Sequence, residues 1–131
     1  MGFERVYSGA PWEREVGYCR ALRAGNQVFV TGTAPVAEGG GVHAPGDAYE
    51  QTKRCLEIMR KALAELGLGM DRITRTHMFV TDISRWREYG RAHGEVFRYH
   101  PPATTMVEVK ALIDPEMLVE IEADGVVASD P

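Results

Sequence analysis

Hydrophobic and polar positions alternate along the chain in patterns that predict strands first and helices later. Residues 18–25 alternate weakly, and residues 27–36 are rich in β-branched and aromatic side chains. Between them, Gly25 and Asn26 form a turn signal, so the two segments predict a β-hairpin. A run of the same kind over residues 72–82 predicts a third strand.

Two amphipathic helices are predicted on either side of that third strand. Asp47 and Glu50 have the spacing of a capping box, and apolar residues then recur at helical intervals. The first helix should therefore begin at Asp47 and end near Leu66, where a glycine follows. The second is predicted to begin with Ser84 as its cap and to stop before the two prolines at 101–102.

The C-terminal part predicts two more strands, over residues 104–112 and 117–127. The resulting order is β-β-α-β-α-β-β within a single domain, residues 1–131, and it predicts an α+β fold. Two helices can cover only one face of such a sheet. The other face must then meet solvent or another subunit.

Both C-terminal strands carry carboxylates inside otherwise apolar runs. Side chains in a strand alternate between faces, so Val119, Ile121 and Ala123 should face the helices while Glu120 and Glu122 face away. In the neighbouring strand the same reasoning places one apolar set against the helices, namely Val107, Val109 and Ala111, and a second set away from them, namely Glu108, Lys110 and Leu112. This charged face is either solvated, with Lys110 pairing a glutamate, or it closes an oligomer whose acids line a cleft.

Composition narrows the class of protein. The chain has 131 residues, is 44% hydrophobic and carries a net charge of −4, which works against broad binding of a nucleic-acid backbone. It has no uncharged apolar run long enough to span a bilayer, and its two cysteines form no disulfide framework, so we expect a cytoplasmic protein. The four histidines lack metal-ligand spacing, and we expect neither a metal nor a cofactor.

Several stretches together resemble the YjgF/RidA family, the reactive intermediate deaminases. They are "GNQVFVTGTAPV", "THMFVTDISRW" and above all "PPATTMVEVKALIDPEMLVEIEA". The resemblance implies a fold similar to chorismate mutase, assembled as a barrel-cored homotrimer with clefts at the subunit interfaces. It also implies hydrolysis of enamine and imine intermediates to carbonyl compounds and ammonia. On this resemblance, Glu120 positions the attacking water, and Tyr18 and Thr31 match other residues of the site.

The chain departs from the family pattern at one informative position. Family deaminases carry an arginine after Pro-Ala that binds the substrate carboxylate, whereas this sequence has Thr104 there, followed by Thr105. A hydroxyl offers one donor and no charge, so it cannot replace a bidentate cation. Met106 and Gly90 also differ from residues often found at their family positions. The chain is therefore a divergent member on this interpretation.

Arg20 is the residue that could compensate for the missing arginine. It lies two residues after Tyr18, so both side chains should project from the same face of a strand. Arg20 is then either a second carboxylate clamp in the cleft or one half of a surface ion pair. Trp12 is either an aromatic lid over the cleft or a packing anchor.

Three functions are compatible with these residues. The first is an enamine/imine deaminase-type hydrolase, in which Glu120 activates water and Tyr18, Arg20, Thr31, Thr104 and Thr105 bind a small carbonyl- or imine-derived metabolite. The second is a non-catalytic ligand-binding or regulatory trimer that kept the cleft. The third, endoribonuclease activity, is an attribute of some relatives and is disfavoured by the acidic charge balance.

Overall fold

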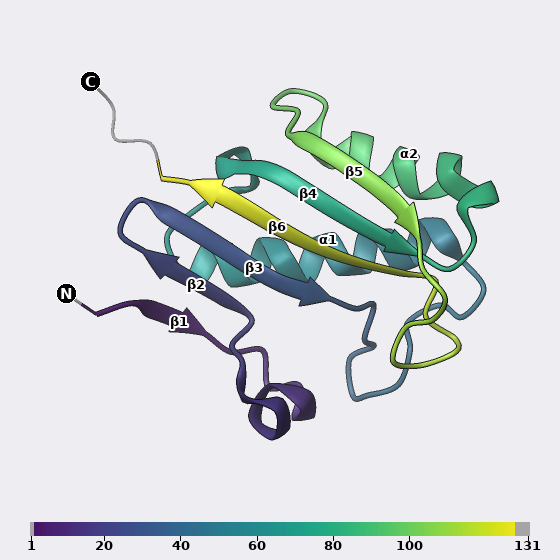
Figure 1. Cartoon of the computed structure of the whole chain (residues 1–131), viewed down its shortest axis with the longest axis horizontal. Coiled ribbons are helices and arrows are strands. Elements are labelled where there is room, and N and C mark those ends of the chain that lie inside the picture. The colour runs from purple at the N-terminus through teal and green to yellow at the C-terminus, as the bar shows by residue number, and fades with distance from the viewer. Residues whose placement is uncertain (1, 128–131) are drawn as a thin grey trace.

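The computed structural model describes residues 2–127 as a mixed α+β fold in which a six-stranded sheet packs against two long helices (Figure 1). The sheet order is β1-β2-β3-β6-β4-β5. The strands are β1 (Glu4–Val6), β2 (Ala21–Ala24), β3 (Gln27–Thr33), β4 (Ile73–Val80), β5 (Ala103–Glu108) and β6 (Val119–Val126). The long helices are α1 (Ala48–Glu65) and α2 (Trp86–Phe97), and short helical turns lie at η1 (Glu13–Gly17), η2 (Met70–Arg72) and η3 (Ile83–Arg85).

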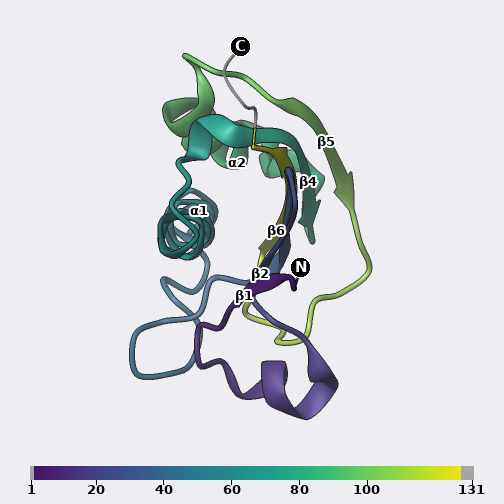
Figure 2. The same cartoon turned by 90° about the vertical axis from the view of Figure 1, so that its left-hand side faces the viewer.

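Both long helices cover the same face of the sheet, as predicted (Figure 2). Within residues 2–127 neither long helix covers the opposite face, which we call the open face. The core lies between these two layers. Val119, Ile121 and Ala123 of β6 are almost fully buried there, which confirms the predicted orientation of this strand. Within residues 2–127, no helix is long and apolar enough to cross a membrane.

The hairpin turn and the first helix form where the sequence predicts them, although β2 begins at Ala21 instead of residue 18 and β3 ends at Thr33 instead of residue 36. β2 pairs antiparallel with β3 around Gly25, whose φ of 62° is a conformation that glycine adopts without strain. The Asp47 side chain accepts a hydrogen bond from the Glu50 N–H at 2.9 Å and caps α1. At the other end, Gly67 turns the chain with a φ of 75°, and the Leu68 N–H donates to the Leu63 carbonyl.

Two features near the helices differ from the prediction. Ser84 is not the cap of the second helix. Asp82 is the capping residue of a short turn at Ile83–Arg85, where its side chain accepts from the Ser84 N–H at 3.0 Å, and α2 follows that turn. The N-terminal strand β1 and the turn η1 were not predicted, because these segments are short and lack a clear period.

The two C-terminal strands are not neighbours, contrary to the prediction. β4 lies between them and pairs with β6 antiparallel and with β5 parallel. β5 ends at Glu108, opposite the last residue of β4, and does not continue to residue 112. As an edge strand it loses its pairing partner there.

The predicted orientation of β5 is also wrong. Its register sets Met106 opposite Met78, and Met106 packs against the core while Val107 is 43% exposed on the open face. Glu108 therefore lies on the helix side, where it accepts a hydrogen bond from the Ile83 N–H at 3.0 Å. The open face carries Glu120 and Glu122 but not Glu108.

Candidate functional site

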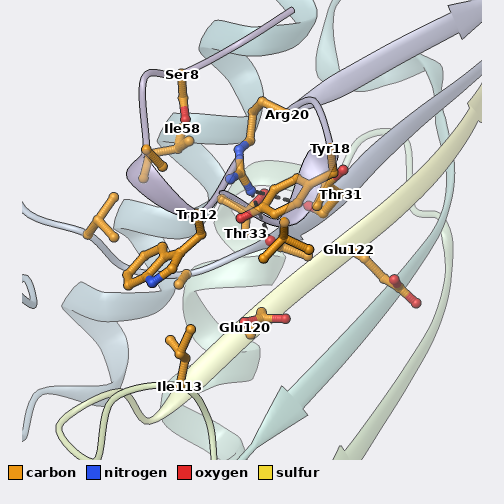
Figure 3. A pocket seen from close by; sticks show the side chains of 15 residues that line it. Ser8, Trp12, Tyr18, Arg20, Thr31, Thr33, Ile58, Ile113, Glu120 and Glu122 are labelled. Atoms are coloured by element: carbon orange, nitrogen blue, oxygen red, sulfur yellow. Dashed lines mark hydrogen bonds between the residues drawn. The ribbon is translucent and has the colours of Figure 1, made fainter. Parts of the chain in front are cut away.

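A cavity of ≈ 310 Å³ opens where the end of β3 meets the start of β6 (Figure 3). A volume near 300 Å³ is the lower end of what small-molecule sites occupy. The segment before β2 supplies one wall, and α1 contributes Ile58. The polar side chains of the lining are Ser8, Trp12, Tyr18, Arg20, Thr31, Thr33, Glu120 and Glu122.

A bulge in β3 shapes one wall of the cavity. The pairing of β3 with β6 shifts register between Val30 and Thr33, which releases Thr31 and Gly32 from regular pairing. The Thr31 hydroxyl donates to the Cys19 carbonyl at 2.7 Å, and the Thr33 hydroxyl donates to the Thr31 carbonyl at 2.7 Å. These bonds hold the bulge in place, so the hydroxyl of Thr31 is already engaged within the chain.

Glu120 lies against this bulge with its carboxylate directed at Gly32. A Cβ atom on residue 32 would lie 2.5 Å from Oε2 of Glu120, so only glycine leaves room for the carboxylate there. Burial raises the pKa of Glu120, Arg20 opposes this and Glu122 adds to it, and the net direction is upward. Within residues 2–127, no group of the protein donates a hydrogen bond to this carboxylate. A carboxylate with a raised pKa is the better proton acceptor.

Arg20 lines the cavity, but its guanidinium is engaged inside the protein. It is only 5% exposed, and its Nε and Nη2 atoms lie 3.2 Å and 3.1 Å from Oε2 of Glu13. Its Nη1 donates to the Gly32 carbonyl at 2.9 Å. The predicted common strand face of Tyr18 and Arg20 is wrong, because β2 begins only at Ala21. Both side chains nevertheless line the cavity, and the Arg20 Cζ lies 5.6 Å from the Tyr18 ring centre. The ion pair, however, is buried and not on the surface.

Three polar residues at or behind this site were not predicted: Ser8 and Thr33, which line the cavity, and Glu13, which lies behind Arg20. Of these three, Glu13 contacts the site through its neighbours. It is 4% exposed and accepts hydrogen bonds from the Ser8 N–H and hydroxyl as well as from Arg20. Burial alone would raise the pKa of Glu13, but the bonds from Ser8 and Arg20 outweigh it and the pKa is lowered. The stretch "WEREVGYCR" contains several charges, and nothing in its spacing singles out this pair.

Trp12 lies at the start of η1 and lines the cavity from the side opposite β6 (Figure 3). It also lines a wider neighbouring cavity of ≈ 920 Å³ that runs along α1. The side chain is partly exposed. Trp12 therefore lines both cavities, and its role as a lid or as a packing anchor stays a prediction.

Thr104 and Thr105 do not line this cavity within one chain. Thr104 lies on β5, on the helix side, with its hydroxyl 2.8 Å from that of Thr76 and 3.5 Å from Nε2 of His93. Thr105 lies on the open face, opposite His77. Burial lowers the pKa of His93 to about 4, so this imidazole is neutral near pH 7. One chain therefore brings Tyr18, Arg20, Thr31 and Glu120 together and leaves both threonines apart.

The fold and the cavity define an α+β protein with a ≈ 310 Å³ cavity beside the half-buried carboxylate of Glu120. Residues 10–127 match the family model described as Endoribonuclease L-PSP. An uncharacterized protein of Streptomyces coelicolor is 39% identical over 121 residues, which cover 92% of this chain and 90% of the relative. A 3-aminoacrylate deaminase of Acinetobacter baylyi is 33% identical over 104 residues, covering 79% and 82%.

A solved structure agrees with these sequence matches. The chain is similar to a member of the YjgF/YER057c/UK114 family from Mycobacterium tuberculosis, with a TM-score of 0.87 and 43% identity. The match covers 96% of this chain and all of the other. The chain belongs to the YjgF/RidA family, as its sequence motifs indicate.

Proposed function

We propose that this chain is a cytoplasmic deaminase-type hydrolase that converts a small imine or enamine to a carbonyl compound and ammonia. The observation that carries this proposal is Glu120, a half-buried carboxylate with a raised pKa at the wall of a ≈ 310 Å³ cavity. One relative, 33% identical, is named for deamination of an enamine, 3-aminoacrylate. The similarity to that relative covers 79% of this chain, so the support comes from the name together with the carboxylate.

In the proposed reaction, Glu120 accepts a proton from a water molecule as the water oxygen attacks the carbon of the protonated imine. The product of this step is a neutral carbinolamine. Glu120 then returns that proton to the nitrogen, and the C–N bond breaks to release ammonia. As the C=O bond forms, the hydroxyl proton passes to Glu120, which releases it to solvent. An enamine enters the same sequence after protonation at carbon gives the protonated imine. Tyr18 and Thr31 are proposed to position the substrate at the cavity wall.

We further propose that three copies assemble with their open faces together, so that the edge strand β5 of one copy approaches the Glu120 cavity of another, with Thr105 on the facing side and Thr104 exposed on the other side of the strand. The open face supports this proposal because it carries the exposed side chains of Phe29 and Val107 beside the His77–Glu122 pair. The helix side is already filled by α1 and α2 (Figure 2).

A binding module without turnover is the second candidate, and a specific observation favours it. The guanidinium of Arg20 is bonded to Glu13, and Thr104 has no charge. Neither residue therefore offers a substrate carboxylate a pair of free, charged N–H donors. Such a site would hold a small neutral carbonyl compound through hydroxyl groups. A ribonuclease remains disfavoured by the net charge of −4.

One experiment separates these candidates. Imines generated in solution from amino acids are supplied with wild-type protein and with Glu120→Gln, and release of ammonia and carbonyl product is followed. Thermal shifts with the carbonyl products are measured in parallel. Turnover by wild type that is lost in Glu120→Gln supports the hydrolase. Thermal shifts without any turnover support the binding module. The absence of both turnover and thermal shifts would refute both candidates.

A further inference from the structure

The Glu13–Arg20 ion pair is buried directly behind the candidate site, where an isolated charge would be costly. Oε2 of Glu13 accepts from Nε and Nη2 of Arg20, and Oε1 accepts from the Ser8 N–H at 3.0 Å. Both oxygens of the carboxylate are therefore occupied. A buried carboxylate with this many donors stays ionised.

The opposite edge of the Arg20 guanidinium reaches the bulge of β3. Nη1 donates to the Gly32 carbonyl at 2.9 Å and lies 3.3 Å from the Thr33 hydroxyl oxygen. Gly32 is the residue against which Glu120 packs. A continuous set of contacts therefore runs from Glu13 through Arg20 and Gly32 to Glu120, although Glu13 itself does not line the cavity.

We infer that Glu13 is a positioning residue of this site. Its carboxylate holds the Arg20 guanidinium on the Gly32 carbonyl and balances its charge, so that Glu120 remains the free carboxylate of the cavity. This inference rests on the proposed function only in so far as Glu120 is the group that reacts. The arrangement of charges that it describes exists whether or not the chain turns over a substrate.

The charges around Glu120 show why the balance matters. The ionisable groups near it are Arg20 and Tyr18 from the segment before β2, Cys55 from α1 and Glu122 from β6. Arg20 is the only cation among these groups, and its charge is offset by Glu13. Without Glu13, the guanidinium would be free to pair with Glu120 and would lower the pKa of that carboxyl.

The test is the titration of Glu120 itself, followed by carbon NMR on protein labelled at the glutamate carboxyl and assigned with Glu120→Gln. In Glu13→Gln, which keeps the shape of the side chain and removes its charge, the Glu120 titration should move down by roughly one pH unit. If the chain is a hydrolase, the acidic limb of its kcat/KM profile should move in parallel. The NMR titration requires no turnover, so failure of the proposed function is seen separately.

A double variant keeps the test decisive if Glu13→Gln does not fold. Glu13→Gln combined with Arg20→Gln removes the cation as well, and the Glu120 titration should then return to the wild-type pH or lie above it, because Arg20 lowers the pKa of Glu120. A titration below that of wild type would show that the shift does not come from Arg20. Glu88→Gln, which removes the carboxylate of the Arg85 pair far from the cavity, is the matched control and should leave Glu120 unchanged.

The inference is overturned by either of two results. The first is a folded Glu13→Gln protein in which Glu120 titrates as in wild type. The second is a double variant in which it titrates below wild type. A shift of equal size in Glu88→Gln would also overturn it, because the effect would then be one of net charge alone.

Discussion

The carboxylate of Glu120 occupies the space that a side chain on residue 32 would need. A Cβ on Gly32 would lie 2.5 Å from Oε2 and 3.2 Å from the carboxyl carbon of Glu120, both closer than ordinary contact. Gly32 has no positive φ that would itself demand glycine. Glycine is needed here because it has no side chain, and the carboxylate of Glu120 fills the space that a side chain would take.

Gly32→Ala should therefore displace Glu120 and leave the fold intact. The clashing atoms are the flexible end of a side chain, so the free energy of unfolding should change by less than about 1 kcal/mol. Turnover or ligand affinity should fall, with turnover lower by roughly 100-fold if Glu120 is the general base. Denaturation and product assays would measure both quantities.

A matched control is Gly94→Ala in α2, where an added Cβ would meet nothing within 4 Å. Alanine is the better helix former by about 0.5–1 kcal/mol, so this variant should gain stability and keep its activity. Full activity in Gly32→Ala would show that the position of Glu120 against the bulge is unimportant.

Glu120→Gln should be more stable than wild type at neutral pH. The folded-state pKa of Glu120 is raised, mainly by burial, so its ionised form is less favourable in the folded state than in the unfolded one. Wild type bears no such penalty below about pH 4.5, where the carboxyl is protonated in both states, and it loses stability as the pH rises through the folded-state pKa. Glutamine has no charge to bury at any pH.

Thermal denaturation of both proteins from pH 4 to pH 8 would check this prediction. The melting temperature of the variant relative to wild type should rise across that range. Activity should be lost in the same variant, which would make Glu120 a residue that lowers stability while it serves the site. A variant less stable than wild type at pH 7 would contradict the prediction.

Thr104→Arg should increase hydrolysis of imines that carry a carboxylate. A charge-assisted hydrogen bond contributes about 1.5–3 kcal/mol, which corresponds to a gain of roughly tenfold or more. The side chain of Thr104 now bonds only to Thr76 and His93 and to the nearby Pro102 carbonyl, so a longer side chain on this exposed strand has room to turn outward. Imines without a carboxylate serve as the control and should show no gain.

Light scattering should give a mass three times the 14.5 kDa of one chain. Val107→Glu places a charge on the open face, where Val107 is 43% exposed, and should shift the protein toward monomer at micromolar concentration. Arg60→Glu, on the outer surface of α1, is the charge-changing control and should leave the mass unchanged. A wild-type monomer would remove the proposed contribution of Thr104 and Thr105.

Local patterns were sufficient for most of the fold. The capping box at Asp47, the turn at Gly25 and the alternation in β6 depend on neighbouring residues, and each forms as predicted. The orientation of β5 could not be obtained in this way, because Met106 and Val107 are both apolar and its pairing with β4 decides which is buried. That pairing is parallel and joins segments separated by a helix.

The candidate site was predicted less completely for a related reason. Tyr18, Thr31 and Glu120 line one cavity of the chain, and their roles there stay predictions. The partner of Arg20 was not predictable, since any of several nearby acids had a suitable spacing and only the turn η1 brings Glu13 to it. The sequence therefore predicts Arg20 as a carboxylate clamp or as half of a surface ion pair, whereas it is half of a buried ion pair.

The position of β6 has a consequence for how the chain folds during synthesis. β6 follows every other strand in the sequence, yet it lies between β3 and β4 and pairs with both. Until residues 119–126 leave the ribosome, the hairpin with α1 and the β4-α2-β5 unit have no sheet contact with each other. Until then, β3 and β4 each expose an unpaired edge that can pair with other chains. The sheet can therefore be completed only after β6 has been synthesised.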